Sequence, residues 1–143
     1  MTIKKQGSAQ WQGSLKRGKG QVSTESGALE ANPYGFNTRF EGQAGTNPEE
    51  LIGAAHASCF SMALSMILGE EGLEPEAIDT RATVSLVQDD DGFSIPAIHL
   101  ETQATVPGAD ADVFQRCADK AKAGCPVSKL FNAEITLEAR LAD

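Results

Sequence analysis

The chain carries one long apolar stretch, residues 51–68, in which almost every side chain is small or hydrophobic. A helix without a polar stripe is normally enclosed on all sides, so this stretch predicts a buried central helix with Cys59 near its middle. Its length suits a membrane span, but His56 and several serines and glycines argue against insertion into lipid. Helix start and stop signals flank it: Thr46 or Asn47 as the cap, Pro48, Glu49 and Glu50 in the first turn, and Gly69 or Gly72 at the end.

Apolar and polar residues alternate in several shorter segments, which predicts β-strands on both sides of this helix. The segment before the helix is expected to form strands joined by glycine-rich turns, with Trp11 and Val22 on the first two. A further strand is expected where Phe36 and Phe40 point to one side and Arg39 to the other. Strands after the helix are predicted at residues 81–87, 98–106 and 135–141.

A second helix is predicted between the last two strands. Its apolar residues keep a helical spacing, an aspartate at position 110 or 112 can cap it, and Gly124 ends it. A short further turn starts at Cys125 and runs to Leu130. The order strands, long helix, strands, helix, strand predicts one α+β domain that takes in residues 1–143.

The central helix needs more cover than one small sheet supplies, because a sheet shields only one side of it. A second copy of the chain is the simplest source of the missing apolar surface. We therefore expect an obligate homodimer in which the central helix lies near the two-fold axis.

Composition narrows the class of protein further. A formal net charge of -8 disfavours nucleic acid and anionic membranes as partners, since both require clustered Lys and Arg. The first residues lack the apolar core of a signal peptide, and three cysteines are too few for a disulfide-built scaffold. The acidic triplet at positions 89–91, next to Gly92, indicates a solvated hairpin tip rather than a cation site. We expect a cytoplasmic protein, in which a cysteine pair is more often catalytic than structural.

Two of the three cysteines are candidates for thiol chemistry. Cys59 lies on the central helix, where it is either a small core hydrophobe or a nucleophile. Cys125 lies where one helix ends and another turn begins, so free N–H groups and the helix dipole are expected to lower the pKa of its thiol. One cysteine on a rigid helix and one at a mobile junction suit attack followed by resolution. Cys117 lies on the apolar stripe of the second helix and is expected to be structural.

A buried thiolate needs a cation or several hydrogen-bond donors nearby, or its pKa rises. The candidate cations are Arg39, Arg17 and His56. His56 precedes Cys59 by three residues and shares its helix face, but it is equally well explained as a core histidine that donates to a carbonyl. Arg39 is expected to reach an interface, where a guanidinium can hold a thiolate and a carboxylate together.

Two motifs carry a family resemblance: Asn47-Pro48-Glu49-Glu50-Leu51 leading to Ala57-Ser58-Cys59-Phe60, and Gly124-Cys125-Pro126-Val127-Ser128 downstream. Together with residues 32–40, they make the chain resemble the OsmC/Ohr family of thiol-dependent hydroperoxide reductases, in particular its osmotically inducible protein C branch. The resemblance covers essentially the whole chain. It implies an OsmC-like fold, an intertwined homodimer with two active sites at its interface, and reduction of organic hydroperoxides without metal, haem or flavin.

By motif position, the resemblance makes Cys59 the peroxidatic cysteine, Cys125 the resolving cysteine, and Glu49 the carboxylate that holds an arginine. In the OsmC-like branch this arginine is Arg39, whereas the Ohr-like pattern places it at Arg17. A peroxide would oxidise Cys59 to a sulfenic acid, and Cys125 would condense with it to a disulfide. An external dithiol must reduce that disulfide, and the resemblance suggests a lipoylated protein.

Glu49 and Cys59 lie ten residues apart on the predicted helix. A rise of about 1.5 Å per residue separates them by roughly 15 Å along the axis, which a glutamate side chain cannot span. Glu49 is therefore expected to act through an arginine, or on Cys59 of the partner subunit. Apolar walls at that interface would favour alkyl and aryl peroxides, and the expected wall residues are Phe36, Phe40, Phe60 and Met62.

Two other functions compete with the peroxidase. A redox-sensing or binding protein would form the same disulfide without efficient turnover. A zinc protein would need the ligands to converge at tetrahedral distances, although the chain contains no Cys-x-x-Cys pair. The ligands of such a zinc site would be Cys59, His56, Cys125 and Cys117.

Overall fold

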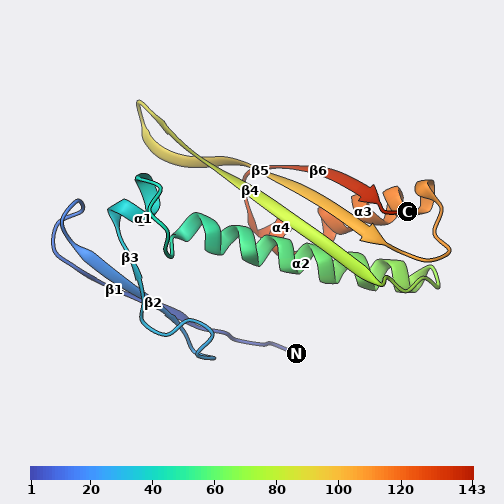
Figure 1. Cartoon of the computed structure of the whole chain (residues 1–143), viewed down its shortest axis with the longest axis horizontal. Helices are drawn as coiled ribbons and strands as arrows, with labels where there is room; N and C mark the ends of the chain where they lie inside the picture. The colour runs from blue at the N-terminus through green and yellow to red at the C-terminus, as the bar shows by residue number, and fades with distance from the viewer. The chain divides into compact units, whose positions relative to one another are not determined.

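The computed structural model describes residues 1–143, which form two compact units, Met1–Leu51 and Ile52–Asp143 (Figure 1). Each unit contains its own three-stranded sheet. Apart from a short helix at residues 36–40, the helices and strands follow one another in the predicted order, so the α+β class is confirmed. The expectation that residues 1–143 make a single domain stays a prediction.

The first unit is built on a small antiparallel sheet. Its strands, in spatial order, are β1 (Gly7–Gln12), β2 (Lys19–Thr24) and β3 (Asn32–Tyr34). Gly20 on β2 pairs with Trp11 on one side and Tyr34 on the other, and the two rings lie 5.6 Å apart between centroids. A Cβ atom on Gly20 would come within 2.6 Å of the Tyr34 ring, so this close ring packing requires glycine.

The prediction of a strand at positions 36–40 is wrong: these residues form the short helix α1 (Phe36–Phe40). Phe36 and Phe40 are four residues apart, and both an α-helix and a β-strand place residues at this spacing on the same side. A segment of five residues is therefore too short to distinguish the helical period from the strand period. The helix brings their rings to 4.9 Å between centroids. Thr38 tightens the turn, because its hydroxyl accepts the Gly35 N–H at 3.0 Å.

The second unit is built on the sheet β4-β5-β6, with β4 (Ala77–Asp89) antiparallel to β5 (Gly92–Thr105) and β6 (Glu134–Leu141) parallel to β5. The predicted alternation is confirmed on the central strand, where Leu100 and Ala104 are buried while His99 and Glu101 face the other side. The β4–β5 connection is a two-residue hairpin tip at the acidic triplet, as predicted.

Helices cover one face of this sheet: α2 (Pro48–Glu70), α3 (Ala111–Gly124) and α4 (Pro126–Leu130) (Figure 1). α3 and α4 make the crossover between the parallel strands β5 and β6. The core lies where α2 and α3 meet the inner face of the sheet, and its largest members are Phe60, Leu64, Leu68, Leu100 and Phe114.

Within the second unit only one face of α2 is covered, and the expectation that a second copy of the chain covers the rest stays a prediction. Its buried positions form a stripe that includes His56, Phe60 and Leu64, whereas Met62 and Met66 are 76% and 62% exposed. By length and composition α2 is long and apolar enough to span a membrane. Its buried stripe lies in the hydrophobic core, however, which is the packing of a core helix in a soluble protein.

Candidate active site

The two candidate cysteines lie on different helices of the second unit. Cys59 is partly exposed on α2, and Cys125 is fully buried at the junction between α3 and α4. Cys125 ends one helix and starts the next, since its N–H donates to Ala121 O at 3.0 Å and its Sγ accepts the Ser128 N–H at 3.4 Å. The predicted junction is therefore confirmed, with the sulfur itself as the N-cap acceptor.

The Cys59 and Cys125 thiols lie close enough to alter each other's pKa, and neither forms a disulfide. The Val127 N–H lowers the pKa of both thiols. Two free thiols this close together are the starting geometry for reversible disulfide formation. The sequence placed both residues in one site, and the fold brings them together.

The groups of the second unit shift the pKa values of the two thiols in opposite directions, so that Cys125 is the more acidic of the two. Burial raises the pKa of Cys125, but the Ser128 hydroxyl and N–H, the Cys59 thiol and the Val127 N–H outweigh burial and lower it below its ordinary value. Burial raises the pKa of Cys59; the Val127 N–H opposes this, while the bond to Cys125 and its charge raise the pKa further. No cation of this unit is among the groups that act on Cys59.

His56 reaches Cys125 rather than Cys59. Its Nε2 lies 2.7 Å from Ser128 Oγ, and Ser128 Oγ donates to Cys125 Sγ at 3.5 Å. The expectation of a histidine that donates to a carbonyl is wrong, and burial lowers the pKa of His56, which disfavours its role as a cation. Nδ1 of the buried ring has no hydrogen-bond partner, and the ring meets Phe131 edge-on at 5.6 Å.

Ser128 is a functional candidate that the sequence reasoning missed. It is the third residue after Cys125, the position at which a helix N-terminal N–H donates back to the cap residue. That spacing was available in the sequence as a signal for the contact with Cys125. The contact with His56 joins residues 72 positions apart, and only the fold reveals it.

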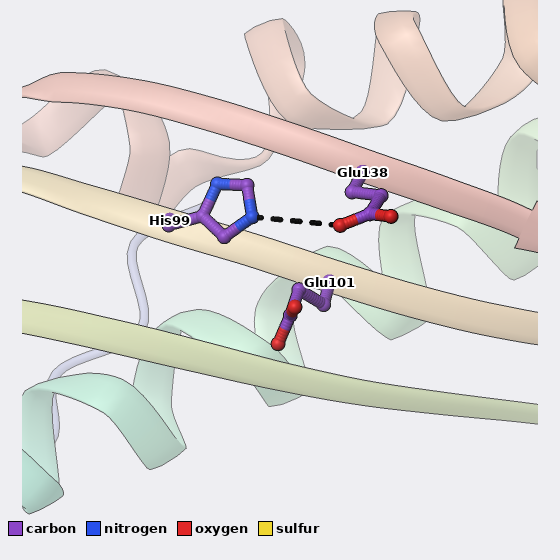
Figure 2. A group of neighbouring side chains, drawn as sticks. All are labelled: His99, Glu101 and Glu138. Carbon is purple, nitrogen blue, oxygen red and sulfur yellow. Dashed lines mark ion pairs between the residues drawn. The ribbon is translucent and has the colours of Figure 1, made fainter.

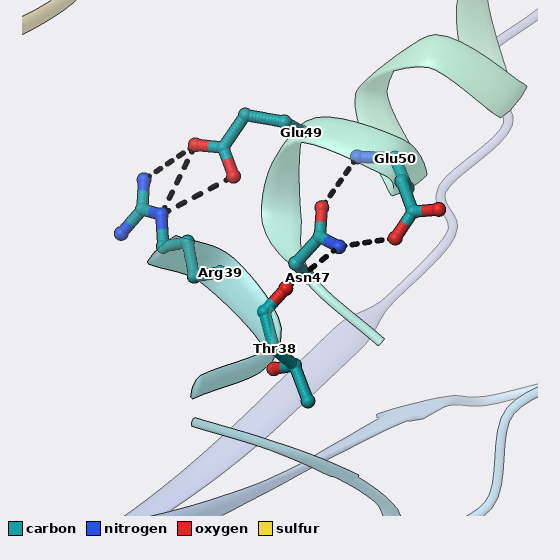
Figure 3. A network of polar contacts seen from close by, with 5 residues as sticks. All are labelled: Thr38, Arg39, Asn47, Glu49 and Glu50. Atoms are coloured by element: carbon teal, nitrogen blue, oxygen red, sulfur yellow. Dashed lines mark hydrogen bonds and ion pairs between the residues drawn. The ribbon is translucent and has the colours of Figure 1, made fainter. Parts of the chain in front are cut away.

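Arg39 and Glu49 form a bidentate ion pair in the first unit (Figure 3). Arg39 Nη2 donates to Glu49 Oε1 at 2.7 Å, and its Nε donates to Oε1 and Oε2 at 3.1 and 3.2 Å. The guanidinium also lies over the Phe40 ring at 5.4 Å, and the Arg39 side chain is 36% exposed. The carboxylate thus fixes the orientation of a cation that keeps free donors.

Asn47 fixes the start of α2 beside this ion pair (Figure 3). Its Oδ1 accepts the Glu50 N–H at 2.8 Å, which makes it the cap residue that the sequence offered together with Thr46. Its side-chain amide donates to the Glu50 carboxylate and, at 3.3 Å, to Thr38 O in α1. These bonds tie α1, which carries Arg39, to the first turn of α2, which carries Glu49.

Arg17 and Cys117 take part in none of the hydrogen bonds and ion pairs described above for the two units. Arg17 is exposed in the β1–β2 turn, where only its backbone N–H is bonded, to Ser14 Oγ at 3.3 Å, and it forms no ion pair. Cys117 is buried on α3 in the hydrophobic core, where burial raises the pKa of its thiol. The expected wall residue Phe60 is likewise fully buried in the core and cannot line a substrate pocket.

One group of potential metal ligands lies on the outer face of the β4-β5-β6 sheet, and it contains no cysteine. His99, Glu101 and Glu138 have ligand atoms within 4.8 Å of one another, and His99 Nε2 lies 3.9 Å from Glu138 (Figure 2). All three are at least partly exposed, and Glu101 also lies 4.0 Å from Arg81. Partly exposed carboxylates of this kind are common on protein surfaces, and the cluster shares no residue with the thiol site.

Acidification should destabilise the protein through His56. Because burial lowers its pKa, the unfolded chain binds the proton more readily than the folded chain. The stability contributed by the neutral ring is complete above the unfolded pKa of about 6.5 and is lost as the pH falls through the lower folded pKa. Urea unfolding of wild type and His56→Gln at a series of pH values should show the steeper loss below about pH 6.5 in wild type. Equal slopes would contradict this account.

Comparison with known proteins gives consistent matches over most of the chain. The family model described as "OsmC-like protein" matches residues 40–140. The chain is 63% identical over 141 residues to "Peroxiredoxin OsmC" of Escherichia coli (strain K12), with 99% of each protein covered. It is 30% identical over 124 residues to "Organic hydroperoxide resistance protein OhrB" of Bacillus subtilis (strain 168), covering 85% of this chain and 88% of that protein.

Solved structures agree with the sequence matches. The crystal structure of the organic hydroperoxide resistance protein OhrB of Bacillus subtilis superposes with a TM-score of 0.71 at 26% identity, covering 96% of this chain and 98% of that one. The resemblance and the fold predicted from the two cysteine motifs are therefore confirmed. With a matching family model and a full-length relative at 63% identity, the chain belongs to the OsmC-like protein family.

Proposed function

We propose that the protein is a cysteine-based peroxidase that reduces organic hydroperoxides to alcohols. The observation that carries this proposal is the pair of free thiols of Cys59 and Cys125, which lie close enough to alter each other's pKa. A relative at 63% identity is named a peroxiredoxin, and a relative at 30% identity is named an organic hydroperoxide resistance protein. The chemistry needs no metal or organic cofactor, because the two sulfurs accept and transfer the electrons themselves.

The reaction divides between the two thiols. The Cys59 thiolate attacks one oxygen of the peroxide, the O–O bond breaks, and the alkoxide takes a proton and leaves as the alcohol. Cys59 is then a sulfenic acid, and Cys125 attacks its sulfur to form the disulfide with loss of water. A dithiol reductant then regenerates both thiols by exchange, and we propose a lipoylated protein in this role.

Cys59 needs a cation to act as the nucleophile, because its surroundings in the second unit raise its pKa. We propose Arg39, which Glu49 already holds through three hydrogen bonds. Glu49 and Cys59 both belong to α2, so the rise of the helix separates them by about 15 Å. The arginine over Cys59 is therefore assigned to the partner subunit's Arg39, with the partner subunit's Glu49 holding it.

The surface of α2 supports the proposal of a homodimer. Its side opposite the core carries no charge between Ala54 and Gly69, and Met62 and Met66 stand far out on it. An uncharged apolar helix face of this length is typical of a protein interface. Free thiols and the soluble core packing of α2 support a cytoplasmic location for this dimer.

The roles of the thiols predict different failures on substitution. Cys59→Ser should abolish peroxide reduction, because no other thiol can become the sulfenic acid. Cys125→Ser should reduce the first equivalent of peroxide and then over-oxidise Cys59 to the sulfinic acid. Single-turnover assays with mass analysis of each peptide measure both outcomes, and Cys117→Ala should reduce peroxide as wild type does.

A loss of the first turnover in Cys125→Ser but not in Cys59→Ser would mean that the roles are reversed. Disulfide formation without steady-state turnover, given an alkyl peroxide and a dithiol, would favour a redox sensor instead.

The dimer should not dissociate without unfolding, because separation exposes the uncharged face of α2 to water. Sedimentation velocity at decreasing protein concentration should show one dimeric species, and Met62→Glu should weaken it by placing a charge in the interface. A folded and active monomer of the unsubstituted protein would contradict the prediction.

Mixed dimers should recover activity if the site is shared between chains. Chains with both Arg39→Ala and Glu49→Ala should be inactive, as should chains with Cys59→Ser. Heterodimers of the two contain one complete site and should recover about half of the wild-type activity. Absence of recovery in demonstrated heterodimers would place all four residues of a site on one chain.

A further inference from the structure

A buried chain of two hydrogen bonds connects Cys125 through Ser128 to His56. Its two links are the contact of 3.5 Å from Ser128 Oγ to Cys125 Sγ and the contact of 2.7 Å from Ser128 Oγ to His56 Nε2. Cys125 and His56 are both fully buried, and Ser128 is 9% exposed. The two-cysteine reaction uses neither Ser128 nor His56.

The position of each proton in these two hydrogen bonds follows from the environment of Nδ1, the imidazole nitrogen that does not contact Ser128. His56 Nδ1 is buried without a hydrogen-bond partner. A buried N–H without an acceptor is rarer in proteins than an unpaired acceptor, so the favoured neutral tautomer keeps its proton on Nε2. Nε2–H then donates to Ser128 Oγ, and the serine proton is left to point at Cys125 Sγ.

We propose that His56 is a positioning residue and Ser128 a direct donor that together stabilise the Cys125 thiolate for attack on oxidised Cys59. This inference rests on the proposed peroxidase and deepens its second step. When His56 is neutral with its proton on Nε2, the Ser128 oxygen accepts a hydrogen bond from Nε2–H. The hydroxyl proton of Ser128 then cannot bond to His56 and is available to the Cys125 sulfur. The result is a hydrogen bond whose direction favours S⁻ over S–H.

The groups around Cys125 are neutral, so, apart from burial, the hydrogen bonds through Ser128 to His56 are the main influence on the ionisation of its thiol. The groups that meet its sulfur are the Cys59 thiol from α2 and the Ser128 hydroxyl with the Ser128 and Val127 N–H groups from α4. None carries a charge at neutral pH. The side chain of His56 hydrogen-bonds to Ser128 and its ring contacts Phe131, and it forms no ion pair, so no carboxylate competes for its tautomer.

The step that benefits is disulfide formation. The Cys125 thiolate attacks the Cys59 sulfenic sulfur, an S–S bond forms, and the S–O bond breaks to release hydroxide, which takes a proton to become water. Cys125 is oxidised and the sulfenic sulfur is reduced, so the electrons balance. Faster closure leaves Cys59 exposed as the sulfenic acid for a shorter time, which limits its oxidation to the sulfinic acid.

A thiol titration tests the proposal without any peroxide. In a Cys59→Ser, Cys117→Ala background Cys125 is the only thiol, and its thiolate absorbance can be followed against pH. Ser128→Ala should lower the thiolate fraction at a given pH about tenfold, since one hydrogen bond to a charged group is lost. His56→Leu should shift the titration in the same direction, and His56→Gln should largely restore it, because the glutamine amide can donate in place of Nε2.

Rapid-mixing kinetics on proteins that retain both Cys59 and Cys125 then identify the reaction step that the variants slow. Ser128→Ala and His56→Leu should form the disulfide more slowly and over-oxidise more readily, with no loss in the rate of sulfenic acid formation, because a less charged Cys125 no longer raises the pKa of Cys59. Unshifted Cys125 titrations in both variants would overturn the proposal. So would a His56→Gln protein that titrates like His56→Leu, which would indicate a purely structural histidine. Absence of peroxide reduction in wild type, with the titration shifts intact, would count against the peroxidase alone.

Discussion

The packing of α2 against the sheet and α3 is the constraint on which the thiol site depends. Phe60 is fully buried in that core, so its neighbour Cys59 is held at a fixed azimuth beside α4. On the other side, the Cys125 N–H closes α3 on Ala121, which lies in the same core. Two sulfurs that must meet within bonding distance are thus each anchored by a rigid element rather than by a loop.

The groups around the two thiols favour different protonation states, in line with the different steps proposed for Cys59 and Cys125. Cys125 is surrounded by neutral donors that stabilise its thiolate inside the second unit, whereas the groups around Cys59 there favour its thiol form. A cation is required to draw the charge to the peroxidatic sulfur, and the pair of Arg39 and Glu49 holds one in a fixed orientation. A bidentate partner of this kind reduces the entropy that the arginine loses when it binds a thiolate.

One helix serves both the core and the exterior. The stripe of α2 through His56, Phe60 and Leu64 is buried, while Met62 and Met66 on the opposite side remain exposed and unaccompanied by charge. This division accounts for an apolar composition that at first sight resembles a membrane span. It also places the thiol at the border between the two faces, since Cys59 is only partly exposed.

Local chemistry along the chain determined the strands around Leu100, the helix cap at Asn47 and the junction at Cys125, because each depends on periodicity or on neighbours within a few residues. The short helix that carries Arg39 could not be predicted from local pattern, because its five residues fit a helical and a strand period equally well. The role of His56 was decided only by tertiary structure. Its partner Ser128 is 72 residues away, and only the packing of α4 against α2 joins them.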